Sequence, residues 1–454
     1  MKRMNQQENK LGTAPVGRLL TSLAIPCIAA QIVNLLYNIV DRIYIGHLPG
    51  IGSTALTGVG VTFPIIMIIS AFSALVGMGG APRASIKMGQ RDNDGAERIL
   101  GNCLALSIAL SVILIAVFEL SGRQLLLLFG ASADTIGYGW NYMSIYVLGT
   151  FFVVVTMGLN NFISTQGFAK TSMFTTIIGA VLNIVLDPLF MFVFDMGVAG
   201  AAWATIISQA VSCIWVLVFL TSRRSILKIR RKYIRMDPKV LLPVVALGVS
   251  PFIMQSTESL LNICFNSSLQ KYGGDLSVGA MTILSSIMQF FSLPIMGLAQ
   301  GAQPIISFNF GAKNKDRVKK AFRLLFICAV TFSVVFWAIN MLAPELLVSL
   351  FASTPDLKEH SSWALRIYLA GAFAMGVQNS CQQTFVALGE AKISLFLALL
   401  RKIILLIPLI FILPLFLADK VFAVFLAEPI ADILAATTTF ICFKVKFSRL
   451  MRKM

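Results

Sequence analysis

The sequence predicts an all-α polytopic membrane protein with twelve transmembrane helices in two lobes of six helices each. Three observations predict it: an apolar composition, twelve apolar runs long enough to cross a membrane, and an internal repeat at half the chain length. Of the 454 residues, 57% are hydrophobic and 13% are charged, whereas soluble domains average roughly 45–50% apolar and about 25% charged residues. We therefore expect the lipid bilayer to be the main environment of this chain.

The apolar runs set the number of spans. A helix needs about 20 mostly apolar residues to cross a hydrocarbon core of ~30 Å. Breaks at glycine, proline and charged residues leave six such runs in the first half, at residues 18–46, 54–80, 97–120, 138–164, 170–194 and 197–221. The second half has six more, at residues 240–270, 278–305, 318–343, 361–387, 392–416 and 420–443.

An internal repeat relates the two halves at an offset of 222 residues. Gly80-Ala81-Pro82 returns as Ala302-Gln303-Pro304, and Gly167-Phe168-Ala169-Lys170 returns as Gly389-Glu390-Ala391-Lys392. An even number of spans gives both copies the same orientation, so the pseudo-two-fold axis follows the membrane normal and a binding site is expected between the copies. The expected units are an N-terminal lobe at 1–222, a basic linker at 223–239 and a C-terminal lobe at 240–454.

The basic residues predict the orientation in the membrane. The formal net charge is +17 with 37 Lys and Arg, and loops rich in these residues stay on the cytoplasmic side. Of the 37, 29 fall in the termini and in one set of alternate loops. The remainder are Arg123, Lys271, Lys358, Arg366 and Lys420 in the other loops, and Arg42, Arg401 and Lys402 within spans. Both termini are therefore predicted to be cytoplasmic. The linker is expected to lie against anionic lipid, not against nucleic acid.

Other features argue against an enzyme and against a cofactor. The seven cysteines have no paired spacing, and the two histidines, His47 and His360, lie near loop ends, so neither a disulfide framework nor a metal cluster is expected. No phosphate-binding loop of the G-x-x-x-x-G-K-[ST] type is present. The first 17 residues also lack a cleavage site typical of a removable signal peptide. If solute transport is the task of this chain, its energy is therefore expected to come from an ion gradient.

The first span carries a stripe of polar residues. Gln31, Asn34, Asn38 and Asp41 follow one another at spacings of 3, 4 and 3, which places them on one helix face. The amides alone are equally typical of hydrogen bonds between helices. An acid at membrane depth costs at least ~2.5–3.5 kcal/mol on insertion and usually marks a functional site. Pro26, in the same span, predicts a bend.

The fifth and sixth spans add residues at the depth of Asp41. Asn183 and Asp187 are four residues apart, hence on one face, and Pro188 predicts a bend directly after them. Counting at ~1.5 Å per residue places Thr205 in the same layer. Two carboxylates in a medium of low dielectric cannot both ionise cheaply. The sequence therefore predicts a pocket that binds a proton, or a sodium ion held by Asp41, Asn183, Asp187 and Thr205.

The second half carries a different set of acids, and Asn266 stands near the position that corresponds to Asp41. Glu258 lies among polar residues near the predicted middle of the bilayer, so it is expected to bind a cationic substrate or a second ion. Glu428 and Asp432 share one face of the last span, and ion pairing with Arg401 or Lys402 is the favoured interpretation. The uncharged residues expected to contact substrate are Gln31, Asn38, Gln255, Met288, Gln289 and Gln382.

Several motifs follow in a characteristic order: Asn38-x-x-Asp41, Gly167-x-x-Lys170, Asn183-x-x-x-Asp187-Pro188 and Gly200-Ala201-Ala202-Trp203-Ala204-Thr205. With them, the chain resembles the multidrug and toxic compound extrusion (MATE) family over nearly its whole length, and within it the MepA-like and DinF-like bacterial branch. The resemblance implies a V-shaped pair of lobes that exports small organic cations and drugs in exchange for H⁺ or Na⁺ by alternating access. It also implies a bacterial cytoplasmic membrane. A monomer is expected, because both lobes lie in one chain.

The resemblance also implies roles for individual residues. Asp41, Asn160, Asn183, Asp187 and Thr205 match the cation-coupling network of the N-terminal lobe, and Asn34 stands where related members often carry glutamine. Glu258 matches the acid used by the sodium-coupled branch. That branch has a further acid in the tenth span, but residues 361–387 contain no Asp or Glu. Coupling is therefore expected in the N-terminal lobe.

The closest alternative is a flippase for lipid-linked saccharides of the same wider superfamily. Such proteins usually line the cavity with arginines that hold a diphosphate. Here the basic residues within spans are only Arg42, Arg401 and Lys402, and acids outnumber them. This balance favours a cationic cargo.

Overall fold

The computed structural model describes residues 10–351 and 354–454, so residues 1–9 of the predicted N-terminal lobe lie outside it. Within these ranges the chain is helical and contains no strand. The first lobe, the N-lobe, consists of α2 (Val16–Gly46), α3 (Gly52–Gly60), α4 (Phe63–Gly89), α5 (Asn93–Leu128), α6 (Ile136–Leu148), α7 (Thr150–Thr165), α8 (Ala169–Pro188), η1 (Leu189–Val193) and α9 (Gly197–Thr221).

The short helix η2 (Arg231–Tyr233) precedes the second lobe, the C-lobe. The C-lobe consists of α10 (Pro238–Gly311), α11 (Lys315–Leu342), α12 (Pro344–Val348), α13 (Pro355–Tyr368), η3 (Ala372–Ala374), α14 (Met375–Ala387), α15 (Ala391–Leu399), η4 (Leu400–Leu406), α16 (Ile407–Phe416) and α17 (Lys420–Lys453).

These helices provide the twelve spans that the sequence predicts. In the described residues, nine helices are long and apolar enough to cross a membrane, and α6 with α7, bent by 56°, form a tenth span. The long α10 contains two spans, because Gly274 breaks it with φ 63° and ψ −162°, a conformation that glycine tolerates. The helices α13, η3 and α14 occupy the region of the predicted span 361–387. The protein is thus a multi-pass membrane protein.

One predicted boundary is wrong. The apolar run 54–80 was expected to form a single span, but its first part forms the separate short helix α3, and the spanning helix α4 covers Phe63–Gly89. The physical reason is Pro64 in the first turn of α4. Proline fits the first turn of a helix but interrupts a continuing one, so the chain begins a new helix at this point.

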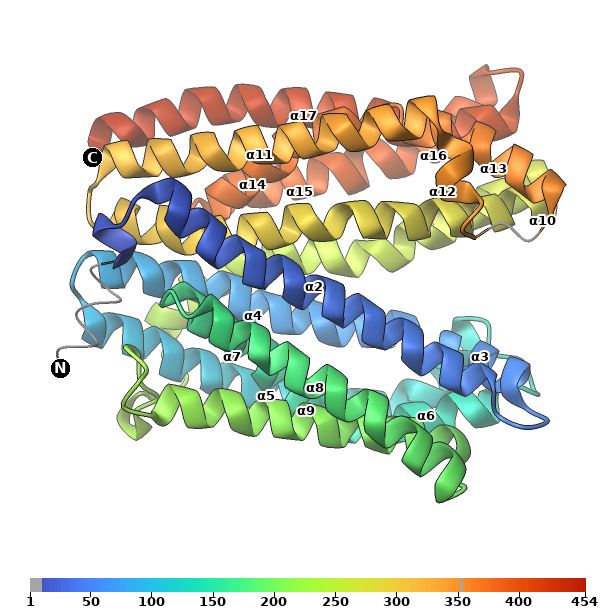
Figure 1. Cartoon of the computed structure of the whole chain (residues 1–454), viewed down its shortest axis with the longest axis horizontal. Helices are drawn as coiled ribbons and strands as arrows, with labels where there is room; N and C mark the ends of the chain where they lie inside the picture. The colour runs from blue at the N-terminus through green and yellow to red at the C-terminus, as the bar shows by residue number, and fades with distance from the viewer. Residues whose placement is uncertain (1–9, 352–353) are drawn as a thin grey trace.

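The two lobes lie side by side and form a V (Figure 1). The described chain begins and ends at one end of the bundle, here called the terminal end, where the lobes are in contact. The lobes diverge toward the opposite end, here called the far end, which carries α3 and α6 of the N-lobe and α12 and α13 of the C-lobe. The V shape that the family resemblance implied is therefore the shape of the molecule.

Glycines allow the lobes to pack closely near the terminal end. A Cβ atom added at Gly89 would lie 2.0 Å from the carbonyl oxygen of Phe308, and one added at Gly311 would lie 2.0 Å from that of Ile86. Positions 89 and 311, like 86 and 308, differ by the repeat offset of 222. The pseudo-two-fold axis therefore passes between α4 and the end of α10, where the two backbones touch.

The segment between α9 and α10 is bound to the N-lobe. The side-chain oxygen Oε1 of Gln166 accepts hydrogen bonds from the Ser225 hydroxyl (3.0 Å) and from the backbone N–H groups of Ile226 (2.7 Å) and Leu227 (2.9 Å). Asp237 forms an ion pair with Arg98 of α5. This hydrogen bond and charge hold the pKa of Asp237 below its usual range. The basic linker is thus an ordered extension of the N-lobe.

Candidate functional site

A compact polar cluster lies between α8 and α9 of the N-lobe. Asn183 Nδ2 donates to Asp187 Oδ1 (3.0 Å) and approaches Thr205 Oγ1 (3.4 Å). The Thr205 hydroxyl in turn donates to the carbonyl of Ala201, one turn earlier (2.9 Å). Asn183, Asp187 and Thr205 are all buried. The sequence placed these three residues in one layer, and the structure brings them together.

Asp41 joins this cluster from α2, which packs along α8. It is close enough to Asp187 for the two charges to interact. Its neighbour Arg42 does not form an ion pair with it in the described part of the chain; the Arg42 guanidinium lies 5.3 Å from the centre of the Phe63 ring instead. We call Asp41, Asn183, Asp187 and Thr205 the N-lobe acid cluster.

The N-lobe acid cluster contains oxygen atoms that make no hydrogen bond in the described part of the chain. Asp41 Oδ1, Asn183 Oδ1 and Asp187 Oδ2 are each buried, and none has a hydrogen-bond partner among residues 10–351 and 354–454. A buried polar atom without a partner costs about 1–3 kcal/mol, and more if it is charged. Carboxylate, amide and hydroxyl oxygens are suitable ligands for a hard monovalent cation, and a carboxylate also accepts a proton. The donor set therefore fits either H⁺ or Na⁺.

Two tyrosines lie beside the cluster, and the sequence did not predict them. Tyr142 of α6 is buried close to Thr205, and its ring stacks on that of Tyr146 with 6.0 Å between the ring centres. Tyr37 of α2 lies within electrostatic range of both Asp41 and Asp187. The spacing of Tyr37 to Asp41, four residues on one helix face, was a usable signal. Nothing in the sequence related Tyr142 to Thr205.

The structure corrects the expected location of Asn160. The family resemblance implied that it belongs to the same network, but the structure places it elsewhere. Its amide nitrogen donates to the carbonyl of Ser172 (3.2 Å), and its oxygen accepts from the Thr175 hydroxyl (3.0 Å). Thr175 precedes Asp187 by 12 residues on α8, which is roughly 18 Å along the helix. Asn160 therefore connects α7 to the start of α8, away from the acids.

The four residues of the polar stripe of α2 do not share one set of contacts. Gln31 Nε2 donates to Gln300 Oε1 of α10 (3.1 Å) and so connects the two lobes. Asn38 is exposed and donates to the backbone carbonyl of Asn34 in its own helix (2.6 Å). Asn34 is half-buried. Of the four residues of the stripe, Asp41 alone reaches the N-lobe acid cluster.

The two prolines expected to bend helices lie in different surroundings. Pro26 is buried inside α2, and the helix continues through it from Val16 to Gly46. Pro188 ends α8, and the next five residues form η1, a stretch of wider π-helix. Such stretches leave backbone groups differently paired and are frequent at functional sites. The predicted irregularity after Asp187 is thus present as a π-helical turn.

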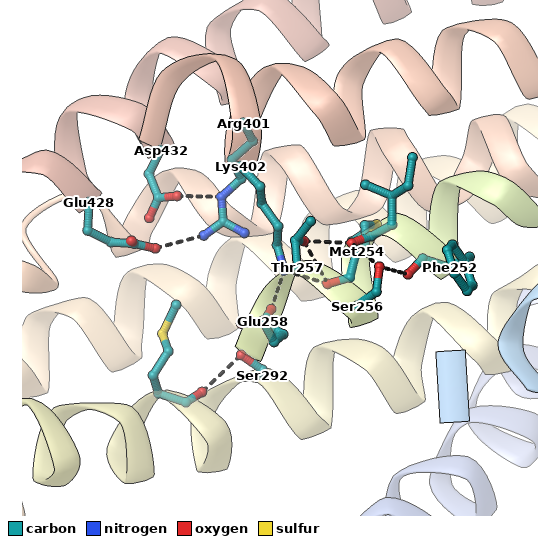
Figure 2. A network of polar contacts seen from close by, with 12 residues as sticks. Phe252, Met254, Ser256, Thr257, Glu258, Ser292, Arg401, Lys402, Glu428 and Asp432 are labelled. Atoms are coloured by element: carbon teal, nitrogen blue, oxygen red, sulfur yellow. Dashed lines mark hydrogen bonds and ion pairs between the residues drawn. The ribbon is translucent and has the colours of Figure 1, made fainter. Parts of the chain in front are cut away.

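The C-lobe contains a second charged cluster, built across α10, η4 and α17 (Figure 2). Arg401 Nε donates to Asp432 Oδ1 (2.7 Å), and Arg401 Nη2 donates to Glu428 Oε1 (3.0 Å). The exposed fractions of these side chains are 14% for Arg401, 6% for Glu428 and 3% for Asp432. The interpretation that the two acids of the last span take part in structural ion pairs therefore holds for Arg401.

Lys402 forms a separate pair in the same region. Its ammonium donates to the backbone carbonyl of Met254 (2.6 Å) and forms an ion pair with Glu258. The Lys402 side chain is only 5% exposed, but that of Glu258 is 56% exposed. Both basic residues belong to the π-helix η4, a type of turn that is frequent at functional sites. We call Glu258, Arg401, Lys402, Glu428 and Asp432 the C-lobe ion cluster.

The uncharged residues expected to contact substrate differ from one another in burial and in their contacts. Gln382 is buried and its Nε2 lies 3.3 Å from the Met254 sulfur, beside the Lys402 contact. Gln255 is half-buried and Gln289 is exposed. Met288 packs against the aromatic cluster around Phe291. Gln382 and Gln255 therefore lie closest to the C-lobe ion cluster, whereas Met288 has a packing role.

Comparisons with known proteins agree with this fold. The chain is 26% identical over 400 residues to the multidrug export protein MepA of Staphylococcus aureus strain MSSA476, covering 88% of this chain and 87% of MepA. It is 24% identical over 420 residues to MepA of Staphylococcus haemolyticus, covering 92% of each chain.

Solved structures show the same architecture. A crystal structure described as MATE in the bent conformation matches with a TM-score of 0.91 at 24% identity, covering 100% of this chain and 99% of the other. A structure described as the outward-facing conformation of a multidrug resistance MATE family transporter matches with a TM-score of 0.90 at 24% identity, covering 97% and 98%. The MatE family model matches residues 26–189 and 251–412, within the first and the second lobe. With both halves matched, this chain belongs to the MatE family.

Proposed function

We propose that this protein is a secondary multidrug efflux transporter that exchanges small organic cations for H⁺ or Na⁺ across a bacterial cytoplasmic membrane by alternating access. The staphylococcal relatives are named multidrug export proteins, which supports drugs as the cargo. The distribution of basic residues supports cytoplasmic termini. The V that opens away from the termini is then an outward-facing state.

The N-lobe acid cluster carries the coupling part of the proposal. Asp41 and Asp187 interact with each other, form no ion pair in the described residues, and have one buried unpartnered oxygen each. Two neighbouring carboxylates that have no ion-paired base are stabilised by a monovalent cation, because the cation relieves the repulsion between them. Binding of H⁺ or Na⁺ therefore lowers the free energy of the state in which α2 and α8 are packed together.

Alternating access follows from this preference. A ligand shifts a conformational equilibrium only by its difference in affinity for the two states. The cation binds best where Asp41 of α2 meets Asp187 of α8. Loss of the cation restores the repulsion between the two carboxylates and favours separation of α2 from α8. Because α2 also contacts α10 through Gln31 and Gln300, movement of α2 changes the interface between the lobes.

The flippase alternative is disfavoured by the pairing of the basic residues. A site for a lipid-linked diphosphate needs cationic groups that are free to bind phosphate. Arg401 and Lys402 are both neutralised by acids of the C-lobe ion cluster, and Arg42 lies over the Phe63 ring. Arg42, Arg401 and Lys402 are therefore each committed to another partner.

The experiment that tests the proposal is ethidium efflux from proteoliposomes, with a pH gradient and a sodium gradient imposed separately. We expect one gradient to drive efflux by the natural chain. We expect Asp41→Asn and Asp187→Asn each to reduce efflux driven by that gradient roughly 100-fold. The matched control is Asp134→Asn, an exposed acid in the loop before α6, which should transport at the natural rate. Full gradient-driven efflux by both cluster variants would overturn the coupling site.

A further inference from the structure

Glu258 differs from the other acids of the C-lobe ion cluster. Glu428 and Asp432 are 6% and 3% exposed and both are bound by Arg401, whereas 56% of the Glu258 side chain is exposed. A charged side chain within a membrane protein faces the bundle interior or a water-filled space, because lipid solvates it poorly. Gln255 and Asn262 flank Glu258 on the same face of α10, three residues before and four after. This face of α10 is therefore polar and accessible.

Lys402 is bound to that accessible acid from the buried side. Its side chain is 5% exposed, and its ammonium is held by the Met254 carbonyl at 2.6 Å as well as by Glu258. A lysine ammonium has three donors, so it keeps the Met254 carbonyl as a partner when Glu258 turns away. Glu258 can therefore leave the ion pair at a lower cost than Glu428 or Asp432 can leave Arg401, because water can reach its carboxylate.

The charges of the cluster are unequal. Three acids, Glu258, Glu428 and Asp432, are opposed by two bases, Arg401 and Lys402. With all five groups ionised, the cluster has one negative charge in excess. One monovalent cation neutralises it, whereas a divalent cation reverses its sign in a region of low dielectric, where uncompensated charge is costly.

We propose that Lys402 is a built-in competitor for the substrate: its ammonium occupies Glu258 until a monovalent organic cation displaces it. Lys402 thereby sets the affinity of the C-lobe for cargo and its preference for single over double positive charge. This inference rests on the proposed function, since it assigns the organic cation to the accessible acid of the C-lobe. It adds a residue, Lys402, that the family resemblance did not assign to the site.

A competitor of this kind has a use in a transporter. A free carboxylate in a medium of low dielectric would bind a lipophilic cation tightly and release it slowly. Lys402 offers Glu258 an alternative partner at a fixed position, so that the departing substrate leaves no unpaired charge behind. A residue that keeps Glu258 paired both with and without bound substrate lowers the difference in free energy between these two states.

Equilibrium binding to the purified full chain in detergent tests the inference without any gradient. The probe is ethidium, followed by fluorescence polarisation, with propidium as a matched probe that has the same ring system and a second positive charge. We expect Lys402→Met to bind ethidium about tenfold more tightly than the natural chain, which is ~1.4 kcal/mol. We expect Glu258→Gln to bind it about tenfold more weakly.

The double variant separates competition from packing. If Lys402 acts through Glu258, Lys402→Met should have no effect in a Glu258→Gln background, which a double-mutant cycle measures directly. The ratio of the ethidium affinity to the propidium affinity should fall in Lys402→Met, because the excess negative charge of the C-lobe ion cluster rises from one to two. Lys402→Arg, which keeps the charge, should bind ethidium within about twofold of the natural chain. Lys271→Met, an exposed lysine at the end of the same span, serves as the control and should change nothing.

Two results would overturn the inference: ethidium affinity in Lys402→Met equal to or weaker than in the natural chain, or an equal gain in the Glu258→Gln background. Each variant is first checked for a monodisperse gel-filtration peak, and Lys402→Arg provides the comparison if Lys402→Met does not fold. Failure of the proposed function has a different signature. In that case no gradient drives efflux, while the binding measurements still report on Lys402 and Glu258.

Discussion

The two lobes share one fold but differ in whether the acids within their spans are paired with basic residues. In the N-lobe, Asp41 and Asp187 lie close enough for their charges to interact, and no base forms an ion pair with either of them in the described residues. In the C-lobe, every acid of the ion cluster has a basic partner. The repeat offset of 222 places Gly179 and Ala180 where the C-lobe has Arg401 and Lys402. These two positions are one of the differences between a site suited to a small cation and a site that already contains bound cationic groups.

The backbone at these positions differs as well. Gly179 and Ala180 lie in regular α8, whereas Arg401 and Lys402 lie in the π-helix η4. In an α-helix, neighbouring residues point about 100° apart, and the wider π turn changes this angle. The C-lobe thus directs Arg401 toward α17 and Lys402 toward α10 from adjacent positions (Figure 2). The equivalent positions of the two lobes thus differ both in residue type and in helix type.

The largest expected effect comes from removing the base that closes the C-lobe ion cluster. Arg401→Met leaves Glu428 and Asp432 buried without a partner, and breaking a buried ion pair in this way costs about 3–5 kcal/mol. We expect that loss in the free energy of unfolding, measured by denaturant titration in detergent. The triple variant Arg401→Met, Glu428→Gln, Asp432→Asn should recover most of it. An unchanged stability in Arg401→Met would mean that the pairing does not stabilise the C-lobe.

The second effect concerns coupling. Asp187→Asn should reduce gradient-driven ethidium efflux roughly 100-fold, which is ~2.7 kcal/mol, because the N-lobe acid cluster then lacks one of its two carboxylates. Ethidium binding in detergent should remain within about threefold of the natural value, since Glu258 is in the other lobe. A parallel loss of binding and efflux would show that the lobes do not divide these tasks.

A third, smaller effect separates the amide from the acids. Asn183→Ala removes the donor to Asp187 Oδ1, which lies 3.0 Å away, and hydrogen bonds to charged groups contribute about 1.5–3 kcal/mol. We expect coupled efflux to fall about tenfold. Asn161→Ala is the matched control, because the Asn161 amide donates to the Met157 carbonyl of its own helix (3.0 Å). Equal rates in the two variants would remove Asn183 from the coupling site.

The smallest effect concerns the linker, which is bound to the N-lobe. The hydrogen bond and charge of Arg98 hold the pKa of Asp237 below its usual range. A carboxyl with a lowered folded pKa stabilises the docked linker above its unfolded value of about 3.9 and loses that contribution as the pH falls through the folded value. Hydrogen exchange of residues 223–239, corrected for intrinsic rates, should therefore stay constant from about pH 7 to 5 and accelerate below about pH 4.

Arg98→Met should show the faster linker exchange already at pH 7. Arg18→Met, which removes an exposed arginine near the start of α2, should leave linker exchange unchanged. If Arg98→Met protects the linker as well as the natural chain does, the ion pair does not hold it, and the contacts of Gln166 suffice.

The spans and the N-lobe cluster could be predicted from the sequence because both depend on local spacing. A span is a continuous apolar run, and Asn183 and Asp187 are four residues apart on one helix. The predicted depth of Thr205 needed only the rise per residue. The error at residues 54–80 was also local: apolar composition continues through Pro64, but the helix does not.

Partners across long separations could not be predicted in this way. Lys402 and Glu258 are 144 residues apart, and their pairing depends on a π-helical turn for which the sequence gives no simple signal. The resemblance to a family misplaced Asn160, because a shared position does not specify which hydrogen bond an amide makes. Tyr142 reaches Thr205 through the packing of α6 against α9, which only the assembled lobe shows.

The contact between Gly89 and Gly311 has a consequence for the history of the fold. Gly89 meets the carbonyl of residue 308, and Gly311 meets the carbonyl of residue 86, its equivalent in the other copy. This reciprocal pattern, in which i meets j and j meets i, is that of an isologous interface in a homodimer. The contact between the lobes thus retains the geometry of two separate six-helix subunits paired about a two-fold axis. A duplicated six-helix unit joined by a linker accounts for this geometry, and the two copies now differ in charge.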